Sequence, residues 1–347
     1  MGGDVTLDIL KTCEQLEQLK EQWSELWLRD PLATPFQHPA WLIPWWHQFG
    51  DGELRIVTIR QNHSLIGLLP MYVRYDLSTR EHQLLPLGIS TSDYLGGIFA
   101  VECTTEHVKA MLQLLRAHSD WAMFFVSQLE PNSRLNEALR RKPNLFKECH
   151  SVACCRMPAT PLDRLPRKIR QNALYYRNCA LRTGQLEFAV ADANNCLQWF
   201  EEFRKMHTNR WKMAGEQGVL AEPAVLDWHR EAIPQLQTHG LLRLCRLNCG
   251  GNPIGGLYSL IDPPIRTNRK QYLYLTAYSP EHAEFRPGTL LLAFAIDHAF
   301  REGVQVIDML RGEEEYKRNW HLNSYSTRSW VWRPAESSSG KELSEFG

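Results

Sequence analysis

Residues 52–69, GELRIVTIRQNHSLIGLL, and residues 240–257, GLLRLCRLNCGGNPIGGL, decide the fold. In each stretch two apolar or alternating runs flank a short polar turn, the pattern of a β-hairpin. Six residues match without a gap at a constant offset of 188 (242 − 54): Gly52, Leu54, Arg55, Ile66, Gly67 and Leu69 against Gly240, Leu242, Arg243, Ile254, Gly255 and Leu257. Both hairpins follow a helical pattern and lead through a third strand to a helix and a buried strand. We therefore interpret the chain as two copies of one α/β unit, with the N-terminal copy diverged.

The join between the two units is expected at residues 157–163, MPATPLD, which contain two prolines and little apolar character. This gives an N-terminal domain at 1–156 and a C-terminal domain at 157–334. Residues 335–347, AESSSGKELSEFG, are polar and predict a disordered tail.

Composition limits the function classes. The 39 basic and 39 acidic side chains among 347 residues leave no net charge, so any anion-binding site must be local. No apolar stretch approaches the ~20 residues of a membrane span, and the N-terminus lacks the features of a signal peptide. The nine cysteines have scattered spacing without a CxxC pair. We expect reduced cysteines, a cytoplasmic location and no metal.

The second unit carries a candidate anion site. Residues 271–279, QYLYLTAYS, alternate, which predicts one face for Tyr272, Tyr274, Thr276 and Tyr278 and the other for Leu273, Leu275 and Ala277. Arg286-Pro287-Gly288-Thr289 then opens a helix that ends at Gly303, and a strand follows at 304–310. The positive end of this helix would suit a phosphate or pyrophosphate, although a plain Pro-Gly turn is the competing interpretation.

The exit of that last strand is crowded with charge. Residues 307–320, IDMLRGEEEYKRNW, place Asp308 inside an apolar run and Arg311-Gly312 at its end, before a segment that predicts a helix with three glutamates in its first turn. Because α/β proteins place their sites at the carboxyl ends of parallel strands, we expect Asp308, Arg311 and Lys317 to lie where a ligand would bind.

Two helices complete the candidate site. Residues 163–184 carry six bases against Asp163 alone, namely Arg164, Arg167, Lys168, Arg170, Arg177 and Arg182. An anion-binding face and a merely solvated face are both open. The helix at 196–213 puts Phe200, Phe203, His207 and Trp211 on one face, with Arg210 alongside. His207 is either a buried histidine or a general base, since its unperturbed pKa is ~6.5.

The order of these motifs resembles the tandem acyltransferases of the GNAT superfamily over roughly residues 30 to 333. The motifs, in chain order, are the basic helix, the HTNRW helix, a hairpin ending PIGGLYSL, and the segments YLYLTAYSPEHAEFRPGTLLL and VIDMLRGEEEYKRNW. The branch described as cellulose-biosynthesis CelD-like is the most similar, and the Fem-type peptidoglycan aminoacyltransferases are more distant. The resemblance implies two GNAT-like domains in tandem, each a mixed twisted sheet flanked by helices.

The resemblance also implies a mechanism. An acyl donor, acetyl-CoA or another acyl-CoA, would lie between the splayed strands at 271–278 and 304–310, with its pyrophosphate near Arg286, Gly288 and Thr289 and further bases from Arg170 and Arg177. The superfamily phosphate loop Arg/Gln-x-x-Gly-x-Gly/Ala is not met, because only Gly288 is present.

An amine acceptor, small or sugar-linked, would attack the donor directly without a covalent intermediate. The catalytic candidates are Lys317, which matches the Fem-type lysine, with Arg311, His207 and Tyr278. From the internal repeat, we expect the acceptor between the two halves, near Asp93, Tyr94, Arg210 and Trp211; for Asp93, an ordinary loop cap is the competing interpretation.

Two other functions remain open. Charged tRNA, or an acyl carrier protein, could replace coenzyme A as the donor carrier; the basic helix favours tRNA, and the neutral chain opposes it. A non-catalytic accessory role in polysaccharide synthesis would explain the missing second glycine.

Overall fold

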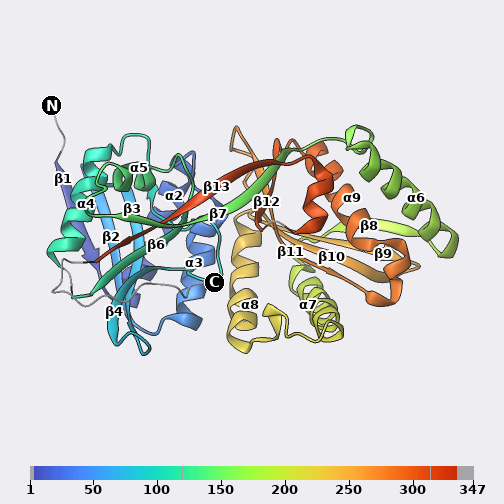
Figure 1. The fold of residues 1–347 in the computed structure, drawn as a ribbon, viewed down its shortest axis with the longest axis horizontal. Coiled ribbons are helices and arrows are strands. Elements are labelled where there is room, and N and C mark those ends of the chain that lie inside the picture. Colours follow the sequence, from blue (N-terminus) through green and yellow to red (C-terminus); the bar gives the residue numbers. More distant parts are fainter. Residues whose placement is uncertain (1–3, 119, 313, 334–347) are drawn as a thin grey trace.

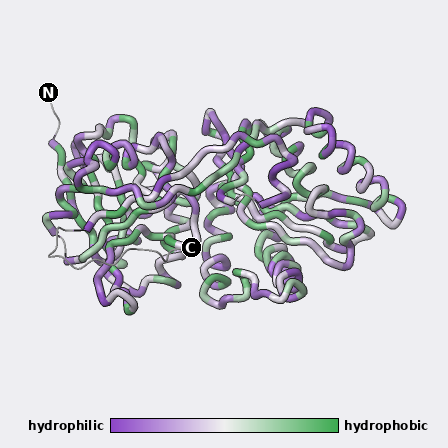
Figure 2. Tube along the Cα trace, in the orientation of Figure 1, coloured by the Kyte–Doolittle hydropathy of each residue, from purple (hydrophilic) through white to green (hydrophobic). Residues whose placement is uncertain are grey.

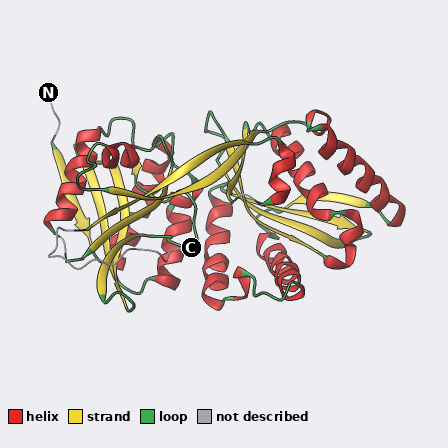
Figure 3. Cartoon of the chain, in the orientation of Figure 1, coloured by secondary structure: helices red, strands yellow, loops and turns green. Residues whose placement is uncertain are grey.

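The computed structural model describes residues 4–118, 120–312 and 314–333, which form two lobes joined by one sheet (Figure 1). Helices lie on both faces of this sheet (Figure 3). The predicted fold class, a mixed α/β tandem, is confirmed. The predicted tail at 335–347 lies outside the described residues.

The strands divide between the lobes. The N-terminal lobe contains β1 (Val5–Leu10), β2 (Glu53–Gln61), β3 (Ser64–Asp76), β4 (Glu81–Pro86), β5 (Ile98–Phe99) and β6 (Met123–Leu129). The C-terminal lobe contains β8 (Leu186–Val190), β9 (Leu242–Cys249), β10 (Asn252–Ile261), β11 (Lys270–Tyr278) and β12 (Val306–Arg311). Two long strands, β7 (Lys147–Pro158) and β13 (Asn323–Trp332), run between the lobes.

The internal repeat is visible in the sheet. Its order is β1-β2-β3-β4-β6-β13-β7-β12-β11-β10-β9-β8, with β5 beside β3, so each lobe repeats the same five-strand pattern outward from the centre. Both predicted hairpins form, β2 with β3 and β9 with β10. In each lobe the next strand pairs in parallel across a helix, β4 with β6 and β11 with β12.

The two lobes exchange their last strands. β7 follows β6 in the chain but pairs with β12, whereas β13 follows β12 but pairs with β6, and the two long strands also pair with each other. The proposed domain boundary at 156/157 therefore falls near the end of β7, which continues to Pro158.

The helices of the N-terminal lobe are α1 (Cys13–Gln18), α2 (Lys20–Arg29), α3 (Pro39–Phe49), α4 (Thr105–Ala117) and α5 (Arg134–Arg140). Those of the C-terminal lobe are α6 (Arg167–Thr183), α7 (Cys196–Met213), α8 (Pro223–Thr238) and α9 (Pro287–Arg301). The 3₁₀ helices are η1 (Pro35–Gln37), η2 (Leu162–Arg164), η3 (Val219–Ala221), η4 (Pro280–Phe285) and η5 (Glu315–Trp320).

Two apolar cores hold these layers. The larger core spans both lobes and is rich in tryptophan; α3 packs on α8, and Trp228 Nε1 donates to Trp41 O at 3.1 Å. The smaller core lies between the C-terminal sheet and helices α6 and α9. Figure 2 shows mostly hydrophobic strands and a more hydrophilic α6 at the periphery. Because the larger core crosses the lobe interface, the lobes are not independent folding units.

Two local predictions were wrong. The register of β11 shifts against β10 between Leu273 and Leu275, a β-bulge, so Leu273 packs on the smaller core while Leu275 packs on the larger. The predicted alternation of faces therefore does not continue past the bulge in β11.

The helix predicted after Gly312, with three glutamates in its first turn, is instead the short 3₁₀ helix η5, with Glu314 as its N-cap and Glu315 in its first turn. Glu313 lies outside the described residues.

Candidate active site

The parallel strands β11 and β12 separate in mid-course. They pair only through Lys270↔Val306, Gln271↔Ile307 and Tyr272↔Asp308. Beyond this point Leu310 takes a left-handed conformation (φ 58°), and the pairing of β12 with β7 on its other edge shifts register between Asp308 and Arg311. Among the described residues, no strand pairs with the β12-facing edge of β11 after Tyr272, which leaves room along it for an extended ligand; the Thr276 carbonyl already accepts from Arg210.

The start of α9 faces this opening. Arg286 is left-handed (φ 46°), and its carbonyl accepts from the N–H groups of Thr289 and Leu290. A Cβ atom at Gly288 would have, among the described residues outside its own helix and its chain neighbours, the Tyr278 ring as its one neighbour within 4 Å, at 3.9 Å. Among the described residues the Arg286 guanidinium has no ion-pair partner. Arg286, Gly288 and Thr289 therefore lie together at the positive end of α9 beside Tyr278, where Arg286 O already engages the N–H groups of Thr289 and Leu290.

Helix α7 brings four predicted residues together at the end of β11. The Arg210 guanidinium lies over the rings of Tyr278 (4.5 Å) and Trp211 (5.6 Å) and donates to Thr276 O at 3.4 Å. Trp211 Nε1 donates to His207 Nε2 at 3.0 Å. Since Tyr278 also faces Gly288, these residues and the α9 terminus border the same opening.

The electrostatics of His207 disfavour a role as base. Burial, and then Arg210, lower its pKa to about 4, so the ring is neutral at pH 7. Nε2 accepts from Trp211, which assigns the proton of the neutral ring to Nδ1. Nδ1 is buried without a partner among the described residues. Neither nitrogen has a free lone pair in this arrangement, and the catalytic assignment of His207 remains a prediction.

Asp93 and Arg311, which were predicted separately, form one ion pair across the lobes. Arg311 Nε lies 3.3 Å from Asp93 Oδ1. With its amide oriented to satisfy both neighbours, Gln128 donates to Asp93 Oδ1 at 3.0 Å and accepts from Arg311. Burial raises the pKa of Asp93 to about 6, Arg311 opposes this rise, and Asp308 adds to it. The N-terminal lobe thus supplies a carboxyl group to the opening of the C-terminal lobe.

The loop that carries Asp93 is fixed at successive residues. Tyr274 donates to Thr91 O at 2.9 Å, Trp41 Nε1 to Ser92 Oγ at 2.8 Å, and Tyr94 to Asp308 Oδ1 at 2.9 Å. The same segment lies against the end of β6, where Gly96 faces Leu129.

Lys317 holds the turn after β12. Its side chain is 4% exposed, and Nζ donates to Arg311 O (2.7 Å) and Gly312 O (3.2 Å) and pairs with Glu314 (2.8 Å). These contacts engage all three ammonium protons. Its position favours fixing the Arg311–Gly312 turn, and the catalytic assignment remains a prediction.

The cationic helix α6 packs on α9 and η4. Arg170 donates to Asp163 O and Arg177 to Asn178 Oδ1 at 3.5 Å. None of the bases on α6 is ion-paired within the described chain. No hydrogen bond or ion pair of the described chain joins Arg170 or Arg177 to Arg286–Thr289, and their part in binding the donor remains a prediction.

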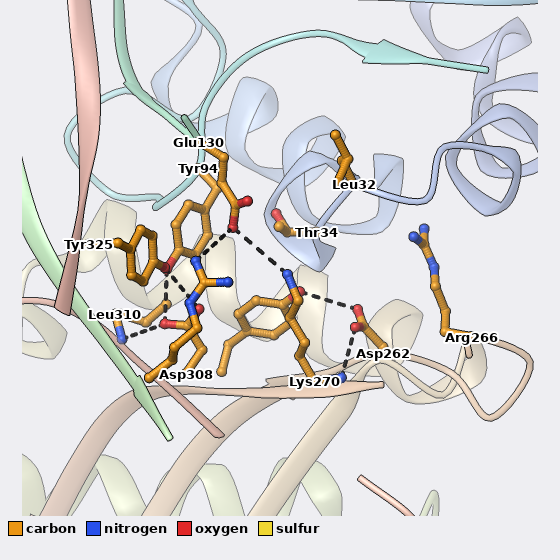
Figure 4. Close-up of polar contacts among 12 residues, drawn as sticks. Leu32, Thr34, Tyr94, Glu130, Asp262, Arg266, Lys270, Asp308, Leu310 and Tyr325 are labelled. Atoms are coloured by element: carbon orange, nitrogen blue, oxygen red, sulfur yellow. Dashed lines mark hydrogen bonds and ion pairs between the residues drawn. The ribbon is translucent and has the colours of Figure 1, made fainter. Parts of the chain in front are cut away.

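Asp308 is the main residue to which the sequence assigned no specific role. It is fully buried and accepts from Tyr94 (2.9 Å), Tyr325 (3.0 Å) and Leu310 N (2.9 Å), as Figure 4 shows. Burial raises its pKa. The acidic residue inside an apolar run was the signal; nothing comparable marks Tyr325 or Gln128.

Within the described ranges, no helix combines the length and apolarity needed to cross a membrane. In the same part of the chain, no group of three or more His, Cys, Asp or Glu side chains is arranged to hold a metal ion.

Comparisons with known proteins agree with the fold. Residues 167–318 match the family model described as an acetyltransferase (GNAT) domain. FemX is similar in structure (TM-score 0.65, 11% identity, 91% of this chain and 96% of FemX covered). L-PGS from Bacillus licheniformis is also similar (TM-score 0.55, 12% identity, 92% of this chain and 91% of L-PGS covered). A tandem GNAT protein from the clavulanic acid biosynthesis pathway is similar as well (TM-score 0.51, 11% identity, 96% of this chain and 100% of that protein covered). At these identities the likeness shows the fold alone. No curated protein matches the sequence.

Proposed function

We propose that the protein is an acyltransferase that moves an acyl group from acyl-CoA to an amine in a ternary complex, within a CelD-like branch of the tandem GNAT proteins. The separation of β11 from β12 beside the open start of α9 carries this proposal. It leaves a backbone edge for an extended thioester and a positive helix end for its pyrophosphate. We also propose the domain division at 156/157 and a cytoplasmic location.

The proposed chemistry uses groups around this opening. The acceptor nitrogen attacks the thioester carbonyl, whose developing charge is stabilised by backbone N–H groups of β11. The carbon–nitrogen bond forms and the carbon–sulfur bond breaks. Asp93 accepts the proton from nitrogen, because its pKa of about 6 leaves it largely ionised at pH 7 and Arg311 orients it. Tyr278, beside Gly288, donates a proton to the departing thiolate.

Calorimetric titration with acetyl-CoA and longer acyl-CoAs tests the donor. Saturable binding is expected, and Gly288→Trp should abolish it because the indole would fill the space in front of α9. Arg301→Trp, at the exposed far end of the same helix, is the matched control and should bind as the wild type does. Failure of every acyl-CoA to bind would reject the proposal.

A second candidate, charged tRNA as donor, is favoured by the bases of α6 that lack ion-pair partners in the described chain. Binding of aminoacyl-tRNA should then weaken steeply with salt. Replacing Arg170 and Arg177 with Gln should reduce that salt dependence. Under this candidate function, acetyl-CoA should not compete with aminoacyl-tRNA for binding. An acyl carrier protein would be tested in the same assay.

A further inference from the structure

One buried carboxylate is bonded to both chain segments that carry the ion pair of the opening. Asp308 Oδ1 accepts from the Tyr94 hydroxyl at 2.9 Å and from Leu310 N at 2.9 Å (Figure 4). Tyr94 directly follows Asp93 in the chain, and Leu310 directly precedes Arg311. The two partners of the ion pair, Arg311 Nε and Asp93 Oδ1 at 3.3 Å, are therefore each one residue away from a bond to the same oxygen atom.

Both points of attachment have a backbone conformation that residues other than glycine rarely adopt. Tyr94 has a φ of 54° and Leu310 a φ of 58°, and both are left-handed. A bulky residue in this conformation is strained and persists only where surrounding contacts hold it. Asp308 supplies such a contact to each of them from a fully buried position on β12. Its carboxylate thus holds the backbone on both sides of the ion pair.

The other contacts of the pair act at different points. Gln128 bonds to the side chains of Asp93 and Arg311, and Lys317 donates to Arg311 O and Gly312 O, in the turn after the arginine. Asp308 instead fixes the backbone from which each of the two paired side chains extends.

We propose that Asp308 is a positioning residue of the reaction, which sets how closely Arg311 approaches Asp93. It does so by holding Tyr94 and Leu310 on one carboxylate oxygen. The inference rests on the proposed function, in which Asp93 accepts the proton of the acceptor amine and Arg311 orients it. A misplacement of about 1 Å in such a group can cost ~10²-fold in rate, so a residue that touches no substrate still affects transfer.

The ionisation of Asp93 reports this positioning. Burial raises its pKa to about 6, Arg311 opposes this rise, Asp308 adds to it and Lys317 opposes it. If Arg311 moves away, the pKa of Asp93 rises further, because a nearby opposite charge favours the ionised carboxyl group. Removing the charge of Asp308 acts in the opposite direction. Burial also raises the pKa of two further titratable groups around Asp93, which are therefore neutral at pH 7: Tyr274 and Cys154.

The test measures the pKa of Asp93 by nuclear magnetic resonance of the full chain labelled with ¹³C at its aspartate carboxyl groups, and Asp93→Asn identifies the signal. Asp308→Asn and Asp308→Ala remove the same charge, but only asparagine keeps an oxygen that accepts from Tyr94 and Leu310 N. We expect the pKa of Asp93 to be ~1 higher in Asp308→Ala than in Asp308→Asn, because only alanine releases Arg311. Acyl transfer should be about tenfold or more slower in Asp308→Ala than in Asp308→Asn.

Two further variants keep the test decisive if Asp308→Ala does not fold. Tyr94→Phe and Tyr325→Phe each remove one hydroxyl donor from the same carboxylate, at Oδ1 (2.9 Å) and at Oδ2 (3.0 Å). Only Tyr94 adjoins Asp93 in the chain. The pKa of Asp93 should therefore be higher, and transfer about tenfold slower, in Tyr94→Phe than in Tyr325→Phe.

Equal pKa values of Asp93 in the two Asp308 variants, or in the two tyrosine variants, would overturn the inference, since Asp308 would then act through charge and burial alone. Equal transfer rates within each pair of variants would overturn its role in the reaction. The expected pKa differences in a protein that transfers no acyl group would support the positioning of the ion pair and, separately, reject the proposed function.

Discussion

The hydroxyl of Tyr94 offers the sharpest test of how the two lobes are joined. It donates to Asp308 Oδ1 at 2.9 Å, and both residues are buried. Tyr94→Phe leaves the ring packing in place but removes one of the three donors to a buried carboxyl group. Hydrogen bonds to charged groups contribute ~1.5–3 kcal/mol. A loss of ~2 kcal/mol in the free energy of unfolding corresponds to a fall of about 3 °C in the melting midpoint, because 347 residues have an unfolding entropy of ~2.1 cal/mol/K each.

The loss should depend on pH in a definite direction. Burial already raises the pKa of Asp308 in the folded protein. Removing a donor to the carboxylate raises it further, so the variant loses additional stability as pH rises from the unfolded-state pKa through the folded-state pKa. The difference from wild type should be smaller at pH 5, where more Asp308 is protonated in the variant, than at pH 8.

Urea denaturation followed by circular dichroism, at pH 5 and pH 8, measures both effects. Tyr75→Phe is the matched control, because Tyr75 is 47% exposed and its hydroxyl makes no hydrogen bond to any described residue. Tyr94→Phe should cost ~1.5–3 kcal/mol at pH 8, and Tyr75→Phe less than ~0.5 kcal/mol. Equal losses in the two variants, or a Tyr94→Phe loss that grows toward pH 5, would refute the reasoning.

Two further predictions follow from the site. Asp93→Asn should lower acyl transfer by ~10²-fold or more and remove the decline in the pH–rate profile below about pH 6, since the pKa of Asp93 is raised to about 6; an unchanged acid limb would exclude Asp93 as the base. Gly312→Ala should destabilise more than Gly215→Ala in thermal unfolding. Both glycines have positive φ, but the added Cβ at Gly312 would lie 2.6 Å from the Glu314 carboxylate that pairs with Lys317, whereas none of the described atoms lies within 4 Å at Gly215. Equal losses would show that the turn does not depend on this ion pair.

Local sequence patterns were sufficient for the elements of the fold. Period-two alternation and polar turns located both hairpins, and Gly303, with a positive φ, follows the end of α9 as expected. The helical period also placed His207 on the buried face of α7. These features depend on residues close in the chain, so a single sequence contains the information.

The partner of each long strand could not be predicted in the same way. The residues of β13 specify an extended strand but not the lobe that it joins, because that choice depends on the edges left open by β6 and β12. The bulge in β11 is equally non-local, since it is set by the register against β10.

The site was predictable only where a chemical anomaly stood out in its local context. Asp308 in an apolar run and Arg311 at a strand exit were such anomalies. Lys270 and Tyr325 sit among polar neighbours, where a charged or hydroxyl side chain is unexceptional. Their contacts with Glu130 and with Asp308 join segments far apart in the local pattern and appear only in the folded chain.

Hydrogen–deuterium exchange with and without acetyl-CoA tests the central claim most directly, because it locates the donor in the chain. We predict slower exchange of backbone amides at 273–278 and 286–292, and no change in β4 and β6, the equivalent parallel pair of the N-terminal lobe. Protection confined to the N-terminal lobe, or no protection under conditions that saturate binding, would contradict a donor site between β11 and β12.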